Sequence, residues 1–358
     1  MFEDLGFETL TAPQVSVIFA LLVGAAFGFL AERSKFCFRR SLVGEDRRQA
    51  WGVWLLALAT ATVGVQFAIF SGLIAFDDHR FMVSDLPILS ILIGGGLFGA
   101  GMVLTRGCVS RLTILSASGN LRAATVILIF AVVAHATLKG VLSPLQSLAG
   151  SVTLDLGDAV DLTRLVPAWA LTSALVVLAL WTAVKSQNKP SHLALAVLIG
   201  LLVPTAWVGT GYVLYDDFDP ITMESLSFTA PTTEALFWTV ASTSIPAGFG
   251  TGLIGGTLAG ALVASLAFKT FTWQSFDSPR QTGRYALGAV FMGVGAVLAG
   301  GCTIGAGLAG IPTFSVATIL ALAAIAGGAV LTHRLVDANP SDAVLSGPSS
   351  TPMQQPAE

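Results

Sequence analysis

The sequence has few charged residues. Asp, Glu, Lys and Arg make up 11% of the 358 residues, whereas soluble domains carry about 25%. This shortage argues against a water-soluble enzyme. The net charge of -3 leaves no basic excess for binding nucleic acid. Hydrophobic residues reach 54% and mean hydropathy is +0.79, which is the composition of a polytopic membrane protein that has the lipid bilayer as its partner.

Cysteine is also rare. The three cysteines are Cys37, Cys108 and Cys302, and they form neither a CxxC pair nor a Cys/His cluster with zinc spacing. An odd count argues against a disulfide framework. No P-loop is present, so direct use of ATP is not expected. We expect no metal, no cofactor and no catalytic residue.

Apolar runs long enough to cross a membrane, about 20 residues each, recur along the chain. They do not alternate polar with apolar residues, so the expected fold is all-α rather than a barrel. We expect nine transmembrane helices, within residues 13–31, 49–76, 86–105, 121–145, 165–184, 193–215, 235–268 and, for the last two, 285–332. The seventh run is too long for one crossing and contains Pro246, which predicts a broken or tilted helix. Gly-rich segments are expected to be broken or re-entrant.

These crossings predict one transmembrane transport domain over residues 1–335. Its halves cover about 13–145 and 193–335 and are linked by a span at 165–184. Residues 336–358 have the composition of a disordered cytoplasmic tail.

Lys and Arg predict the orientation, because cytoplasmic loops of membrane proteins are enriched in them. With the N-terminus outside, the inner segments hold 15 of the 18 Lys and Arg. We therefore expect a bacterial inner-membrane protein with a periplasmic N-terminus and a cytoplasmic C-terminus. Aromatic residues near the expected span ends predict an interfacial belt; they are Trp51, Trp54, Trp169, Trp207, Tyr212 and Tyr215.

Two segments of the chain repeat each other around a cysteine. Residues 98–108 read FGAGMVLTRGC and residues 292–302 read MGVGAVLAGGC, with six of eleven positions identical. In the expected topology the two copies run in opposite directions, as in an inverted repeat, whose substrate site lies at the repeat interface near mid-membrane. Gly28 and Cys37 have the same nine-residue separation and form a weaker third copy.

Glycine lets a backbone leave the helix, and such breaks are tolerated at membrane depth where they line a cavity. We expect breaks along a path at Gly28, Gly99, Gly101, Gly107, Gly293, Gly295 and Gly301. An anion on that path needs positive charge, which predicts roles for Arg33, Lys35, Arg106 and Arg111, while Arg39, Arg40, Arg47 and Arg48 are read as topology charges. Ser110 and Thr303 lie beside two of the thiols in sequence and are added to the path.

Three motifs together resemble the YeeE/YedE-type membrane proteins. They are RSKFCFRRSL around Cys37, GGGLFGAGMVLTRGCVSRL around Cys108 and FMGVGAVLAGGCTIGAGLAG around Cys302, and the resemblance covers roughly residues 15–332. It implies a transporter of sulfur compounds, with thiosulfate or a similar small anion as substrate. It also implies that the three cysteines pass the anion along by weak S–H contacts, without a covalent intermediate. A neutral thiol is a weak donor and a polarizable partner.

One position departs from the family pattern, in which a small residue commonly follows Gly-Cys-x-Ser. Here Arg111 follows, and an extra cation near the central thiol affects which sulfur-containing anion is preferred. Some members carry a fused sulfur-carrier domain that is not found here, so a separate cytoplasmic sulfur-carrier or sulfurtransferase protein would be the partner.

Two alternatives stay open. One is transport of another sulfur or selenium compound, and the other is a membrane thiol oxidoreductase, which would normally need a paired dithiol.

Overall fold

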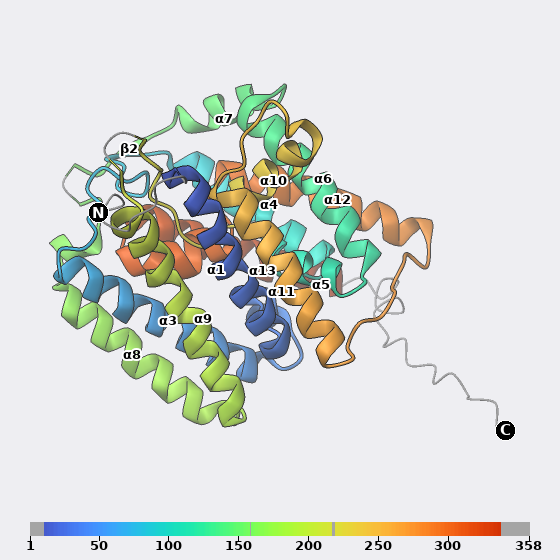
Figure 1. Cartoon of the computed structure of the whole chain (residues 1–358), viewed down its shortest axis with the longest axis horizontal. Coiled ribbons are helices and arrows are strands. Elements are labelled where there is room, and N and C mark those ends of the chain that lie inside the picture. Colours follow the sequence, from blue (N-terminus) through green and yellow to red (C-terminus); the bar gives the residue numbers. More distant parts are fainter. Residues whose placement is uncertain (1–10, 158, 217–218, 338–358) are drawn as a thin grey trace.

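The structure is a computed structural model that describes residues 11–157, 159–216 and 219–337, and it consists almost entirely of helices (Figure 1). The first half of the chain forms α1 (Ala12–Ser34), α2 (Phe38–Val43), α3 (Arg47–Phe70), α4 (Ile88–Leu104), α5 (Val109–Ala117), α6 (Leu121–Lys139) and α7 (Ser143–Gly150). The second half forms η2 (Leu162–Arg164), α8 (Ala168–Lys185), α9 (Pro190–Val208), η3 (Gly209–Val213), α10 (Ala230–Ala241), α11 (Phe249–Ala267), α12 (Pro279–Leu298), η4 (Thr303–Gly310), η5 (Ile311–Thr313) and α13 (Val316–Asp337). The strands β1 (Asp85–Leu86) and β2 (Leu154–Asp155) form one antiparallel pair.

Eight helical segments of the described chain are long and apolar enough to cross a membrane. A ninth crossing results when α12 and the segment Thr303–Thr313, which meet at a 40° bend, are taken as one span. The all-α, polytopic architecture is therefore confirmed. The seventh expected run is indeed broken, because α10 ends at Ala241 and α11 begins only at Phe249.

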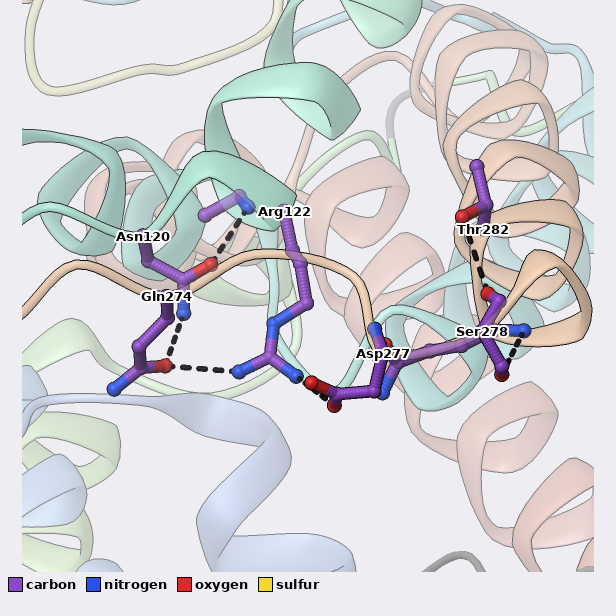
Figure 2. Close-up of polar contacts among 8 residues, drawn as sticks. Asn120, Arg122, Gln274, Asp277, Ser278 and Thr282 are labelled. Atoms are coloured by element: carbon purple, nitrogen blue, oxygen red, sulfur yellow. Dashed lines mark hydrogen bonds and ion pairs between the residues drawn. The ribbon is translucent and has the colours of Figure 1, made fainter.

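The loops gather on two opposite faces, which we name by their charge. The basic face is formed by residues 35–46, 118–120, 186–189 and 268–278, and the acidic face by 71–87, 140–157, 159–167, 214–216 and 219–229. Figure 2 shows how the basic face is tied together: Asn120 donates to Gln274 at 2.8 Å, and Arg122 lies 3.4 Å from Asp277. On the acidic face, β1 pairs with β2, and Ser315 Oγ donates to the Phe81 carbonyl at 2.6 Å.

Helices α1 and α11 lie side by side and run in the same direction (Figure 1). Glycine recurs every fourth residue along α11, at Gly252, Gly256 and Gly260, and faces the α1 backbone. A β-carbon on Gly256 would overlap the carbonyl oxygen of Leu21. Small residues at four-residue spacing allow such close backbone packing inside a membrane, where no hydrophobic effect holds helices together.

The duplicated segments form the antiparallel pair α4 and α12. Gly94 packs on Leu298, and Gly288 packs on Leu104. These two contacts map onto each other when residue numbers are shifted by 194, the spacing of Cys108 and Cys302. The contact of Gly101 with Met292 maps in the same way onto that of Gly295 with Phe98. The repeat is therefore inverted about a two-fold axis that passes between α4 and α12.

The aromatic belt is wrong for two of its six residues. Trp54 is 2% exposed and Trp207 is 3% exposed, so both pack inside the bundle instead of at its surface. Trp54 lies against Phe38, with ring centroids 4.7 Å apart, and Trp207 Nε1 donates to the carbonyl of Ala309 at 3.3 Å. A tryptophan near the end of a span can lie in an interfacial belt or pack inside the bundle beside a helix break. Its position in the sequence does not distinguish these two cases.

The α1–α11 contact provides a test with a matched control. Replacing Gly256 by Ala forces the two helices apart, and overpacking of this kind typically costs about 1–3 kcal/mol. We expect the melting temperature of the detergent-solubilised protein to fall. At the neighbouring Gly255, a β-carbon would meet no atom of the described chain within 4 Å, so Gly255→Ala should leave the melting temperature unchanged or raise it. Equal melting temperatures for the two variants would contradict the packing described.

Candidate functional site

Each cysteine follows the same backbone turn. A long helix ends in a residue with left-handed backbone, one residue follows, and the cysteine then caps a short helix. The left-handed residues are Lys35 (φ 51°), Arg106 (φ 61°) and Gly300 (φ 73°). Only Gly adopts this conformation without steric cost, so the two cations are held there by the surrounding structure.

The three turns bring the thiols together inside the bundle. The Cys37 and Cys108 side chains contact each other, and Thr303 lies against Cys108. The Sγ of Cys108 is 3.3 Å from Ser110 Oγ, and the Sγ of Cys302 accepts a hydrogen bond from the backbone N–H of Gly305 at 3.4 Å. Cys108 and Cys302 are each 1% exposed, and all three cysteines are free thiols.

Two of the seven path glycines lie at backbone breaks. Gly107 connects α4 to α5, and Gly301 connects α12 to η4. The other five lie inside regular helices, so the expectation of a backbone break is wrong for Gly28, Gly99, Gly101, Gly293 and Gly295. Their physical role is close helix packing, because a β-carbon at each would overlap atoms of a neighbouring helix.

The flanking cations are placed differently from one another. Arg33 lies over the ring of Phe268, 3.8 Å from its centroid, and it is exposed like Lys35 and Arg106. Arg111 points into the bundle and pairs with Glu32 at 3.0 Å, with both side chains less than a fifth exposed. Glu32 was missed from the sequence, although a lone acid at the end of an apolar run is a signal for such a pairing.

Several buried donors near the thiols have no hydrogen-bond partner within the described part of the chain. They are Ser34 Oγ, Trp54 Nε1, Thr229 Oγ1 and Thr303 Oγ1. Buried polar groups are nearly always hydrogen-bonded, and leaving one unpaired costs about 1–3 kcal/mol. Neutral donors of this kind can bind an anion without the repulsion that a carboxylate would exert.

A cavity of about 470 Å³ opens on the acidic face and leads toward Cys302. Its lining includes Ser227 and Gly305, and Gly305 is the residue whose N–H binds Cys302 Sγ. The rest of the lining mixes Trp207 with the ionisable residues Asp77, Asp78, His79, Arg80, Tyr215 and Glu224. The sequence pattern did not predict that these ionisable residues lie together, because they belong to two loops that are far apart in the chain.

The charge of this cavity depends on pH. Burial, together with the nearby Glu234 carboxylate, raises the pKa of Glu224 to about 7. Burial and the neighbouring Arg80 lower the pKa of His79 to about 4, so this imidazole is neutral at neutral pH. Arg80 supplies positive charge, while Glu224 becomes negative only above about pH 7.

A second cavity of about 300 Å³ lies on the basic face and is lined by Arg106, Arg284 and Tyr285 among others. Arg39 interacts electrostatically with these three residues and with Cys37. The thiols thus lie between two cavities, one approaching Cys302 and the other approaching Cys37. The arrangement suits an anion that crosses the bundle in small steps, since weak binding at several sites permits both entrance and release.

A bundle with an inverted repeat, helix breaks at its centre and a cavity on each face defines a multi-pass membrane transporter. A family model described as "Sulphur transport" matches residues 33–331. The chain therefore belongs to this sulphur transport family, the YeeE/YedE group. It is similar to the Thiosulfate transporter TsuA of Escherichia coli K12, with 28% identity over 82% of this chain and 86% of the relative. It is also similar to the Thiosulfate transporter TsuA of Spirochaeta thermophila, with 26% identity over 84% and 93%.

The raised pKa of Glu224 predicts a pH-dependent stability. Because the folded-state pKa of about 7 exceeds the ordinary value of 4.5, folding favours the protonated carboxyl, and stability is lost as pH rises from 4.5 through about 7. We expect the wild type to melt at a lower temperature at about pH 8 than at about pH 6. Glu224→Gln, which stays neutral, should remove most of that difference. An unchanged pH dependence in this variant would contradict this role of Glu224 and assign the effect to Glu234 instead.

Proposed function

We propose that the protein imports thiosulfate, or a similar small sulfur-containing anion, across the bacterial inner membrane. The observation that carries the proposal is the meeting of Cys37, Cys108 and Thr303 inside the bundle, between the two cavities. The relatives named as thiosulfate transporters support the choice of substrate.

In the proposed mechanism the anion moves from the acidic-face cavity to Cys302, then to Cys108, then to Cys37. At each step a neutral thiol donates a weak hydrogen bond and offers a polarizable surface to the terminal sulfur. The N-termini of α5 and η4 start at Cys108 and Cys302, and such helix ends favour negative charge. A thiolate would repel the dianion, so the thiols act in their protonated form.

The orientation follows from the charge of the two faces. We place the basic face in the cytoplasm and the acidic face in the periplasm, because Lys and Arg gather on cytoplasmic loops. The N-terminus is then periplasmic and the C-terminus cytoplasmic. A separate sulfur-carrier or sulfurtransferase protein would receive the anion at the basic face.

The pairing of Arg111 with Glu32 bears on the substrate. Because Glu32 lies 3.0 Å away, it offsets part of the charge of the extra cation at the position where the family commonly has a small residue. Arg111 still interacts electrostatically with the Cys37 thiol. This pairing supports thiosulfate as the substrate despite the unusual residue.

Single replacement of each cysteine tests the relay. Ala removes both the donor and the polarizable sulfur, whereas Ser keeps a donor of similar size. We expect uptake of radiolabelled thiosulfate to fall about tenfold or more for Cys108→Ala, with Cys37→Ala and Cys302→Ala also impaired and each Ser variant in between. Amounts of folded protein in the membrane serve as the control. Undiminished uptake in all three Ala variants would end the relay proposal.

The substrate itself is tested by competition. A panel of unlabelled thiosulfate, sulfate, selenate, sulfite and sulfonates is added in excess during uptake of labelled thiosulfate by the wild type. We expect unlabelled thiosulfate to compete best, because it is the member of this panel with a terminal soft sulfur atom and the thiols are polarizable. Stronger competition by a selenium compound or a sulfonate than by unlabelled thiosulfate would assign that compound as the substrate.

One observation favours a second function. Cys37 and Cys108, although distant in sequence, have adjacent side chains, so they meet the need of a thiol oxidoreductase for a pair able to form a disulfide. Non-reducing mass spectrometry after quenching during uptake separates the two functions. A Cys37–Cys108 disulfide that appears only in the presence of substrate would favour the oxidoreductase, and persistent free thiols favour the transporter.

A further inference from the structure

The two-fold relation extends beyond α4 and α12 to most of the bundle. Pairs of helices in the first half have counterparts in the second half that also touch. The contact α1–α11 corresponds to α9–α3, α2–α13 to α10–α6, α2–α3 to α10–α11, α5–α6 to η4–α13, and α6–α12 to α13–α4. This pattern matches α1, α2 and α3 with α9, α10 and α11, and leaves α7 and α8 outside the repeat.

Each short helix therefore has a partner across the axis. The helix capped by Cys108, α5, corresponds to η4, which is capped by Cys302. The helix capped by Cys37, α2, corresponds to α10, and the residue that caps α10 is Thr229. Three of four equivalent positions thus hold a cysteine, and the fourth holds a threonine.

Aromatic packing brings the two segments close to each other. Phe36 precedes Cys37 and Phe228 precedes Thr229 in the chain. Both rings pack on Phe27, with centroids 6.5 Å and 5.3 Å away. The two capping residues therefore each follow a phenylalanine that packs on Phe27. The segments differ in two respects. Thr229 follows the long connection between η3 and α10 and not a tight helix end, and its backbone is helical (φ -86°, ψ -76°), whereas the backbone of all three cysteines is extended.

Thr229 has the properties of a binding residue. It is 8% exposed, and its Oγ1 has no hydrogen-bond partner within the part of the chain that the structure describes. It does not cap its own helix with that oxygen. By contrast, Thr232 and Thr233 on the same helix donate to the carbonyls of Phe228 and Ala230, each at 2.7 Å. An unpaired buried hydroxyl at the start of a twelve-residue helix offers a donor at the positive end of the helix dipole.

Its neighbours place Thr229 between the acidic-face cavity and Cys302. Ser227 and Ala230 both line that cavity. The backbone of Phe228 lies against the Cys302 thiol. On the opposite side of the axis, the side chain of Cys37 contacts that of Cys108.

We propose that Thr229 forms a fourth anion-binding position, next to Cys302 on the side of the acidic face, where its hydroxyl donates a hydrogen bond to an oxygen of a tetrahedral sulfur oxoanion. The proposal deepens the transport function above and rests on it for the identity of the substrate. The four positions in order are Thr229, Cys302, Cys108 and Cys37. A hydroxyl is a stronger donor than a thiol, so the first position recognises the oxygens of the anion and the later ones accommodate its soft sulfur.

Uptake kinetics test this assignment. Thr229→Val keeps the shape of the side chain and removes the donor, so we expect KM for thiosulfate to rise about tenfold or more with a smaller change in kcat. Thr229→Ser restores the donor and should keep KM near the wild-type value. Thr233→Val, which removes a buried hydroxyl of the same helix bonded to backbone, is the matched control and should leave KM unchanged. An unchanged KM in Thr229→Val, or an equal rise in Thr233→Val, would overturn the assignment.

A second arm does not depend on which anion is transported. In the T229C variant, a negatively charged methanethiosulfonate reagent is added from the acidic face, and peptide mass spectrometry locates the label. We expect labelling at position 229, slowed severalfold by excess sulfate, which has the same tetrahedral oxygens and does not consume the reagent. If the wild type imported no thiosulfate but sulfate still protected position 229, the proposed substrate would fail and the oxoanion position would stand. Labelling that sulfate does not slow, or no labelling, would contradict the position itself.

Discussion

Backbone-to-backbone packing of helices is the constraint on which the rest of this structure depends. Glycines on α11 allow α1 to pack against it, and glycines on α4 and α12 allow these two helices to pack against each other. A β-carbon at these glycines would overlap atoms of the neighbouring helix. Only at this separation do the ends of α1, α4 and α12 reach the same region of the bundle. The cysteines are therefore positioned by residues that never touch them, which explains why five glycines first read as openings are in fact contacts.

The centre of the bundle, where we propose that an anion binds, carries little net charge. Arg111 is balanced by Glu32, and the groups nearest the sulfurs are hydroxyls, thiols and backbone N–H. A full charge at this depth would be costly and would also hold a dianion too firmly for release. In the proposed mechanism, neutral donors offer several weak binding positions instead, and the charged residues act mainly at the two cavities.

The sequence predicted the fold well because hydropathy and the repeated motif can both be read from residues that are adjacent in the chain. Hydropathy predicted nine crossings, and the duplicated Gly-Cys segments predicted the inverted repeat, which the symmetric contacts of Gly94 and Gly288 confirm. The candidate site could be predicted only where residues are adjacent in sequence. The Arg111–Glu32 pair, the acidic-face cavity around Glu224 and the buried positions of Trp54 and Trp207 depend on contacts between distant segments, for which hydropathy contains no information.

The place of α8 outside the repeat has a consequence for how such a chain can be built. Each repeated unit crosses the membrane four times, α1, α3, α4 and α6 in one and α9, α11, α12 and α13 in the other. An even number of crossings returns the chain to the side where it started, so two units joined directly would share one orientation. The single helix α8 packs on α3 at the edge of the bundle (Figure 1). It adds one crossing between the two units, so the second unit starts on the other side of the membrane and has the opposite orientation. Deleting this peripheral helix would leave every repeated segment intact and still destroy the antiparallel meeting of its halves.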